Sequence, residues 1–183
     1  MKTTFIFLAD GFEEVEAMTS IDVMRRAGMP VVTVSINDGL EVTGAHGVTV
    51  MADSVFDLED FSDAEWLVLP GGMPGATNLA SHEELCELLK ARNDEGGRIG
   101  AICASPSVVL APLGILNGRQ AVCYPGMEVP VPDVQWGDQP VAVSGNVVTG
   151  NGPAAAAAFA LAMVRESLGN DAAAQVAAGM LLA

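Results

Sequence analysis

Cys103 is the side chain in this sequence best placed for nucleophilic chemistry. It directly follows an apolar segment at residues 98–102 (RIGAI), and residues 104–106 (ASP) open the next predicted helix. A side chain at such a strand-to-helix turn projects from the sheet, and small neighbours allow the turn to form. The free N–H groups and positive end of the helix favour a thiolate, so we expect a depressed thiol pKa. The alternative interpretation is a small, buried apolar side chain.

Glu16 is the predicted partner of Cys103 in proton transfer. It belongs to residues 10–16 (DGFEEVE), which follow another apolar segment. Glu13 and Glu16 are three residues apart, so they share one face of a helix. A carboxyl group held against a thiolate has a raised pKa and could donate a hydrogen bond to sulfur or move a proton. Glu13 and Glu14 could equally serve only to stabilise the helix N-terminus.

A glycine-rich loop at residues 70–75 (PGGMPG) follows a third apolar segment. The backbone amides of Gly71 and Gly72 could form an oxyanion hole together with the amide of Ala104. A phosphate-binding loop is the weaker alternative, because the segment lacks the GKS or GKT of a P-loop and does not match GxGxxG. A tight turn with no chemical role is a further alternative.

Three other side chains are candidates for the same pocket. Cys123 and Tyr124 end a predicted strand and could both face it, and His46 could lie on the surface or reach a neighbouring site. Neither His46 nor His82 has the spacing of a metal ligand, so no metal site is predicted. Cys86 fits a helix interior.

The elements that must position these residues alternate between strand-like and helix-like segments. Strands are predicted at residues 3–8, 31–36, 66–69, 98–102 and 120–123, with a hairpin at 141–143 and 147–149. Helices are predicted at 13–27, 82–93, from 105 onward, 153–168 and 171–180. Residues 41–51 are expected to be extended, followed by an acidic loop, and residues 125–138 to be irregular.

This alternation predicts a mostly parallel sheet with helices on both faces. Ligands of such sheets bind beyond the carboxyl ends of the strands. The loops that carry Glu16, Gly71, Gly72 and Cys103 all follow predicted strands, so we expect them to meet at one edge of the sheet.

Composition excludes several classes of partner. Half of the 183 residues are hydrophobic and the formal net charge is −15. That charge disfavours nucleic acid and anionic membranes as partners. The N-terminal apolar run is short and has no signal-peptide features, and the alanine-rich stretch near residue 160 is too short to span a bilayer. Three cysteines without a CxxC pair fit a reducing, cytoplasmic location rather than a disulfide framework.

Four motifs occur in the order and at the spacing of the ThiJ/PfpI superfamily. They are GFEEVE at residues 11–16, DVMRRAG at 22–28, LPGG at 69–72 and AICASP at 101–106. The sequence resembles this superfamily nearly from end to end, and most of all the branch of the parkinsonism-associated protein deglycase (DJ-one). The resemblance implies a single domain over residues 1–183, similar to class I glutamine amidotransferases. It also implies a flavodoxin-like three-layer α/β sandwich, a homodimer and no cofactor.

The same resemblance implies roles for individual residues. Cys103 would be an oxidation-prone nucleophile, Glu16 its proton donor, and Gly72 and Ala104 the source of backbone amides. Activities of the superfamily include cofactor-free glyoxalase (methylglyoxal to lactate), disputed deglycation, and sensing of oxidative stress through cysteine sulfinate. Some relatives have been linked to thiazole biosynthesis.

Several positions depart from the pattern of the branch. Tyr124 stands where the branch often has histidine, and a phenol is a poor base at neutral pH. Ala104 stands where the protease-type relatives have histidine, which disfavours peptidase activity. Asn151 replaces an arginine.

Two basic residues of the pattern still have counterparts here. Arg26 remains, and His46 stands where relatives can place a basic residue that faces the dimer partner. Arg26 and His46 therefore join Glu13, Tyr124 and Cys123 as candidate pocket residues.

Two functional hypotheses follow from these features. The first is a glyoxalase or deglycase-type enzyme that acts on small reactive carbonyl compounds through Cys103 and Glu16. The second is a redox sensor or stress-protective protein that works through oxidation of Cys103. A stand-alone amidase or hydratase is a weaker third possibility.

Overall fold

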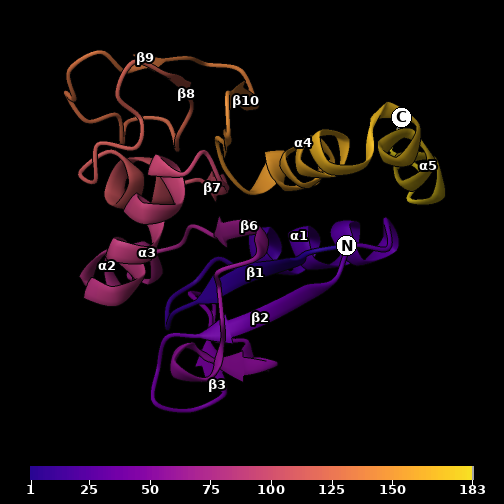
Figure 1. Ribbon diagram of the computed structural model, residues 1–183, viewed down its shortest axis with the longest axis horizontal. Coiled ribbons are helices and arrows are strands. Elements are labelled where there is room, and N and C mark those ends of the chain that lie inside the picture. Colours follow the sequence, from indigo (N-terminus) through magenta and orange to yellow (C-terminus); the bar gives the residue numbers. More distant parts are fainter. Residues whose placement is uncertain (183) are drawn as a thin grey trace.

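A computed structural model describes residues 1–182. Its centre is a seven-stranded sheet (Figure 1) in which all neighbouring strands are parallel except the last two along the chain. In spatial order the strands are β10 (Val141–Ser144), β11 (Val147–Gly150), β7 (Arg98–Ile102), β6 (Ala64–Leu69), β1 (Thr3–Leu8), β2 (Val31–Ser35) and β5 (Ser54–Val55). The predicted mostly parallel sheet and the terminal hairpin are confirmed.

Helices cover both faces of this sheet, which confirms the three-layer α/β sandwich (Figure 1). One face carries α1 (Glu14–Arg26), α4 (Ala156–Leu168) and α5 (Asn170–Gly179). The other carries α2 (Gly75–Ser81), α3 (Glu83–Asp94) and a π-helical turn at Pro106–Leu110.

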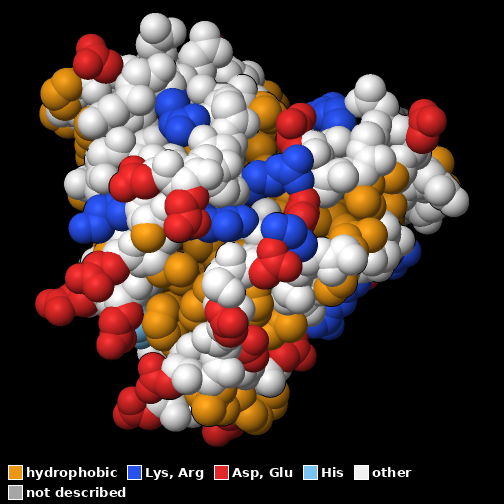
Figure 2. Space-filling view, viewed as in Figure 1, with side chains coloured by type: hydrophobic (Ala, Val, Ile, Leu, Met, Phe, Trp, Pro, Cys, Tyr) orange, Lys and Arg blue, Asp and Glu red, His pale blue; other side chains and the backbone are white. Residues whose placement is uncertain are grey.

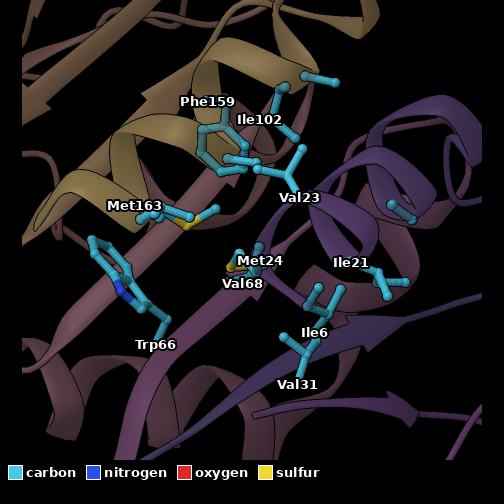
Figure 3. Close-up of a cluster of buried hydrophobic side chains, with 14 of the residues drawn as sticks. Ile6, Ile21, Val23, Met24, Val31, Trp66, Val68, Ile102, Phe159 and Met163 are labelled. Atoms are coloured by element: carbon cyan, nitrogen blue, oxygen red, sulfur yellow. The ribbon is translucent and has the colours of Figure 1, made fainter. Parts of the chain in front are cut away.

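The two halves of the core follow from the alternation of side chains along the strands. In β1, Ile6 and Leu8 face α1 and α4, whereas Phe5 and Phe7 face the opposite layer. Figure 3 shows Phe159 of α4 over the first of these faces. Because both faces are covered, the central strands are apolar throughout rather than alternating with polar residues.

Some segments differ from the sequence predictions. Residues 41–51 form a separate hairpin of β3 (Glu41–Thr43) and β4 (Thr49–Met51), and the acidic loop contains β5 and a 3-10 turn at Phe56–Leu58. Helix α2 was not predicted. The segment expected to be irregular contains β9 (Gln135–Trp136), which pairs with a shortened β8 (Gln120–Ala121) outside the main sheet.

Acidic side chains are spread widely over the surface seen in Figure 2, while several lysine and arginine side chains lie near its middle and others lie toward its rim. Among residues 1–182, no helix has both the length and the apolar character needed to cross a membrane.

Candidate functional site

Cys103 occupies a strained turn between β7 and the π-helical turn. Its φ is +64°, a conformation that is unfavourable for a residue with a side chain. Hydrogen bonds on both sides hold the backbone there: the Cys103 N–H donates to the Gly150 carbonyl, and the Tyr124 N–H donates to the Cys103 carbonyl, each at 2.9 Å. The structure therefore contains the strand-to-helix elbow that the sequence indicates.

Ser105 fixes the position of the elbow relative to the glycine-rich loop. Its buried hydroxyl donates to the carbonyl of Pro70 at 2.5 Å. The ends of β6 and β7 are therefore joined directly where the loop passes Cys103.

Glu16 lies beside Cys103 and has no solvent exposure. It is the third residue of α1, which begins directly after the loop that follows β1. Its Oε2 accepts a hydrogen bond from the Gly71 N–H at 2.7 Å, while the buried Oε1 has no hydrogen-bond partner among residues 1–182. The carboxyl group as a whole interacts with the Cys103 side chain. Sequence reasoning had offered Gly71 as an oxyanion donor. Because its N–H is already bound to Glu16, that role does not fit, and Gly71 positions the carboxyl group instead.

Burial is the main influence on the protonation of both groups. It raises the pKa of Glu16 to about 7, against the hydrogen bonds from Gly71 and Cys103. Burial, followed by the charge of an ionised Glu16, also raises the pKa of Cys103 to about 12. Hydrogen bonds from the amides of Gly72 and Ala104 lower it by less. The prediction of a lowered thiol pKa is therefore wrong when Glu16 is ionised. Cys103 can be a thiolate at neutral pH only if Glu16 holds the one proton that remains on the pair.

Glycines are needed where the loop approaches Cys103. A Cβ added at Gly71 would lie 2.8 Å from Oε2 of Glu16 and 2.9 Å from the carbonyl oxygen of Ile102. Gly72 has a φ of +91°, and its amide is one of the two that reach the sulfur. A side chain at Gly71 would displace the groups around Cys103, whereas one at Gly72 would clash with the backbone of residues 11–13.

His46 lies near the start of α1 but contacts Glu14 rather than Cys103. Its Nδ1 is 2.9 Å from Oε2 of Glu14 and 3.5 Å from Oε2 of Glu13. The bond to Glu14, followed by the charge of Glu13, raises the pKa of His46. Burial raises the pKa of Glu14, but hydrogen bonds from the side chain and backbone of His46 and from other amides outweigh it and lower that pKa to about 2.

Glu13, Glu14 and His46 have ligand atoms within 4.8 Å of one another, a grouping that the sequence spacing did not reveal. These ligand atoms are close enough together to bind one cation. In the structure their hydrogen bonds join the hairpin β3–β4 to the start of α1.

Tyr124 borders a cavity of about 350 Å³, which is also lined by residues 125 and 151–154. Tyr124 is 48% exposed, whereas Cys123 is buried and its thiol is 3.5 Å from the Tyr124 carbonyl. Burial raises the pKa of Cys123. Of this pair, the structure brings only Tyr124 to the cavity, and sequence reasoning did not anticipate the lining by Asn151 and its neighbours.

Arg26 does not reach the site. It is the last residue of α1, and ten residues of helix separate it from Glu16, which corresponds to about 15 Å. It pairs with Asp22 at 2.7 Å and borders a different cavity, beside α5. Its assignment to the pocket is wrong because the helix carries it to the opposite edge of the sheet.

Comparison with known proteins places this geometry in a family. A model of the DJ-1/PfpI family matches residues 2–166. Protein DJ-1 homolog B of Arabidopsis thaliana is 38% identical over 164 residues, which are 90% of this chain and 37% of that protein. The chain spans less than half the length of the two Arabidopsis relatives that it matches.

Two further proteins match over most of both chains. A deglycase of Pyrococcus abyssi is 33% identical over 150 residues, which are 81% of this chain and 89% of that protein. The structure of oxidised Toxoplasma gondii DJ-1 has a TM-score of 0.93 and 35% identity, and the match covers 100% of both chains.

Proposed function

This chain belongs to the DJ-1/PfpI family, and we propose that it is a cofactor-independent glyoxalase or deglycase-type enzyme acting on small reactive carbonyl compounds such as methylglyoxal. Support comes from the contact between the buried Glu16 and the sulfur of Cys103, and from the relative named as a deglycase. The contact between these two side chains is the observation on which the proposal depends.

The proton shared by this pair belongs on Glu16. A buried carboxylate needs several donors to remain ionised, and Oε2 has only the Gly71 N–H while Oε1 has none from the backbone. The sulfur, in contrast, receives the amides of Gly72 and Ala104. A protonated Oε1 that donates to a thiolate satisfies both groups and leaves one negative charge on the pair.

The first step joins the sulfur to the substrate. The Cys103 thiolate attacks the aldehyde carbon of methylglyoxal and forms a C–S bond, and the electron pair of the C=O bond moves to oxygen. Glu16 gives its proton to that oxygen, which completes a hemithioacetal. The amides of Gly72 and Ala104, released from the sulfur, are close to the developing oxyanion.

Glu16 then acts as the base. As a carboxylate it removes the proton from the former aldehyde carbon and gives it to the neighbouring carbonyl oxygen, which produces an enediol. It then takes the proton of the first hydroxyl group and delivers it to the neighbouring carbon, so that the first carbon becomes a carbonyl. The product is a lactoyl thioester on Cys103. Water cleaves that thioester, releases lactate and restores the thiolate and the protonated acid. The sum is methylglyoxal plus water to lactate and one proton released to solvent, with no external oxidant or reductant.

The test is lactate formation from methylglyoxal by the wild-type chain, Cys103→Ala and Glu16→Ala. Cys86→Ala is the matched control, since Cys86 lies on α3 away from the site. We expect lactate from wild type and Cys86→Ala only. Turnover that survives Cys103→Ala would show that another group forms the bond to substrate.

A redox sensor is the second candidate, and the oxidised form of the T. gondii relative favours it. The thiolate would react with two molecules of hydrogen peroxide to give a sulfinate and two waters, and Glu16 would donate a hydrogen bond to the new oxygen. All three cysteines are free, as a reducing cytoplasm would keep them. Peptide mass spectrometry after mild peroxide should find two added oxygens at Cys103. Equal oxidation of Cys86 and Cys123 would contradict a tuned site.

We also propose a homodimer. Val15 and Met18 are exposed on α1, and Val48 and Met51 are exposed near or on the hairpin β3–β4. Met18 and Met51 border the same shallow cavity, so these apolar side chains adjoin one another and could pack against a second copy. Light scattering should give twice the chain mass, and Met51→Glu should lower it. A wild-type chain that remains monomeric would contradict the dimer.

A further inference from the structure

The residues that line the cavity beside Tyr124 are held close to Cys103 by backbone hydrogen bonds. One wall is Tyr124, whose N–H donates to the Cys103 carbonyl. The other begins at Asn151, directly after Gly150, whose carbonyl accepts the Cys103 N–H. The space between these walls therefore opens next to the elbow, and its lining carries no charged side chain.

The lysine and arginine side chains lie away from the edge of the sheet that is formed by the carboxyl ends of the strands, where Cys103 is located. Lys2 forms an ion pair with Asp63, which directly precedes β6, and Arg98 is the first residue of β7. Arg119 donates hydrogen bonds to the turn that precedes β11. These contacts lie at the amino ends of the strands, whereas Cys103 follows a carboxyl end. Five residues of β7 span about 17 Å, so these cations are remote from the sulfur.

The remaining cations lie toward the same remote edge. Arg25 donates to the carbonyl of Val31, which opens β2, and Arg26 is the next residue. Arg92 donates to the first residue of β6, and Lys90 precedes it on α3. Arg165 immediately precedes Glu166, whose carbonyl accepts from Arg98. These five and the three above make up all eight lysines and arginines of the sequence.

Carboxylates, in contrast, gather near the site. Glu13 lies close enough to raise the pKa of Glu16, and Glu128 close enough to raise that of Cys123. Of the two histidines, His46 is already paired with Glu14 and Glu13, and His82 borders a separate cavity with residues 36–38 and 55–57. An incoming anion therefore meets acidic side chains and no free lysine or arginine.

From this arrangement we infer that the cavity between Tyr124 and Asn151 is a subsite for the uncharged end of the substrate, and that the site excludes carbonyl compounds bearing a carboxylate. The inference rests on the proposed function for its substrate class. Methylglyoxal, which has a methyl group beside its two carbonyls, fits the subsite. Glyoxylate, which has a carboxylate in that place, is repelled.

Alkylation of Cys103 tests this selectivity without turnover. Iodoacetamide and iodoacetate have nearly the same shape and attack the same thiolate, but only iodoacetate is charged. The ratio of their rates at Cys103, measured by peptide mass spectrometry, cancels the fraction of thiolate. We expect the ratio of the iodoacetamide rate to the iodoacetate rate to be at least tenfold higher at Cys103 than for 2-mercaptoethanol. This tenfold difference between the two ratios should decrease in high salt. A ratio equal to that of 2-mercaptoethanol overturns the inference.

A cation placed in the subsite should remove this excess preference for iodoacetamide. At about 6 Å and an effective dielectric constant of about 40, one positive charge changes the rate with iodoacetate about tenfold. Asn151→Arg should reduce the ratio by that factor, and Ala154→Arg at the exposed rim serves if the first variant does not fold. Gln175→Arg on α5 makes the same change in net charge far from the site. Equal effects of the near and remote variants would show that net charge alone acts, which contradicts a subsite.

Turnover separates this inference from the proposed function. If the chain makes no lactate from methylglyoxal but shows the expected alkylation ratio, the enzymatic proposal fails and the uncharged subsite remains supported. If it forms lactate but consumes glyoxylate with equal kcat/KM, the subsite inference alone is overturned.

Discussion

Replacing Glu16 with glutamine should remove a pH-dependent loss of stability. Glu16 is fully buried, and burial raises its pKa from an ordinary value near 4.5 to about 7. The folded chain therefore keeps a proton that the unfolded chain releases between these two pH values. The contribution of Glu16 to the free energy of unfolding is therefore largest below pH 4.5. It decreases as the pH rises from 4.5 to about 7 and stays low above pH 7.

The size of the effect follows from that difference in pKa. At about 1.36 kcal/mol for each pKa unit, the rise from 4.5 to about 7 corresponds to about 3 kcal/mol. About 2 kcal/mol of this should be lost between pH 5 and pH 7.5. Titrating groups outside the pair, including His46 and Asp53, contribute equally to wild type and Glu16→Gln, so the difference between the two reports Glu16 and the Cys103 thiol coupled to it.

Urea unfolding at pH 5 and pH 7.5 measures this difference. Wild type should lose about 2 kcal/mol more than Glu16→Gln over that interval. Glu87→Gln, on the exposed face of α3, makes the same chemical change in solvent and should behave as wild type. If wild type and Glu16→Gln lose stability in parallel, the carboxyl group of Glu16 is not protonated by burial and the reasoning is refuted.

Three further predictions concern the groups around the pair. Gly71→Ala should abolish selective alkylation of Cys103, because the added Cβ would lie 2.8 Å from Oε2 of Glu16; wild-type reactivity by mass spectrometry would contradict the tight fit. Ser105→Ala should lower the free energy of unfolding by about 1–3 kcal/mol, since it leaves the buried Pro70 carbonyl without its donor; an unchanged urea midpoint would show that this bond contributes nothing. His46 should titrate above its ordinary pKa of 6.5 by NMR, and Glu14→Gln should lower that pKa; no change on substitution would show that the ion pair does not form in solution.

The central strands could be predicted from the sequence because their environment is uniform. The predicted bounds of β1 and β7 match the structure, since both are short apolar runs buried on two faces. The elbow at Cys103 was also predictable, because an apolar strand followed by small residues and proline leaves few alternatives. In the same way, the loops that end β1, β6 and β7 were expected at one edge of a parallel sheet.

Other features depend on contacts that no local pattern encodes. The sequence of α2 (GATNLAS) has no apolar periodicity, and its helix forms against neighbouring elements. The pairing of β8 with β9 joins segments separated by thirteen residues of turns and prolines. Arg26 lies on the helix of Glu16, and only the length and direction of α1 show that it points to the other edge. The pKa of Cys103 depends on burial and on the charge of Glu16, neither of which its neighbours in sequence reveal.

The pH dependence of Cys103 alkylation tests most directly where the shared proton resides. The rate with iodoacetamide should be followed from pH 5 to pH 12, with peptide mass spectrometry to separate Cys103 from Cys86 and Cys123. If Glu16 holds the proton and the sulfur is a thiolate, the rate should reach its plateau by about pH 8. If the thiol holds the proton beside an ionised Glu16, the rate should stay low at neutral pH and rise only toward pH 12. The second profile would contradict a nucleophilic Cys103 at physiological pH.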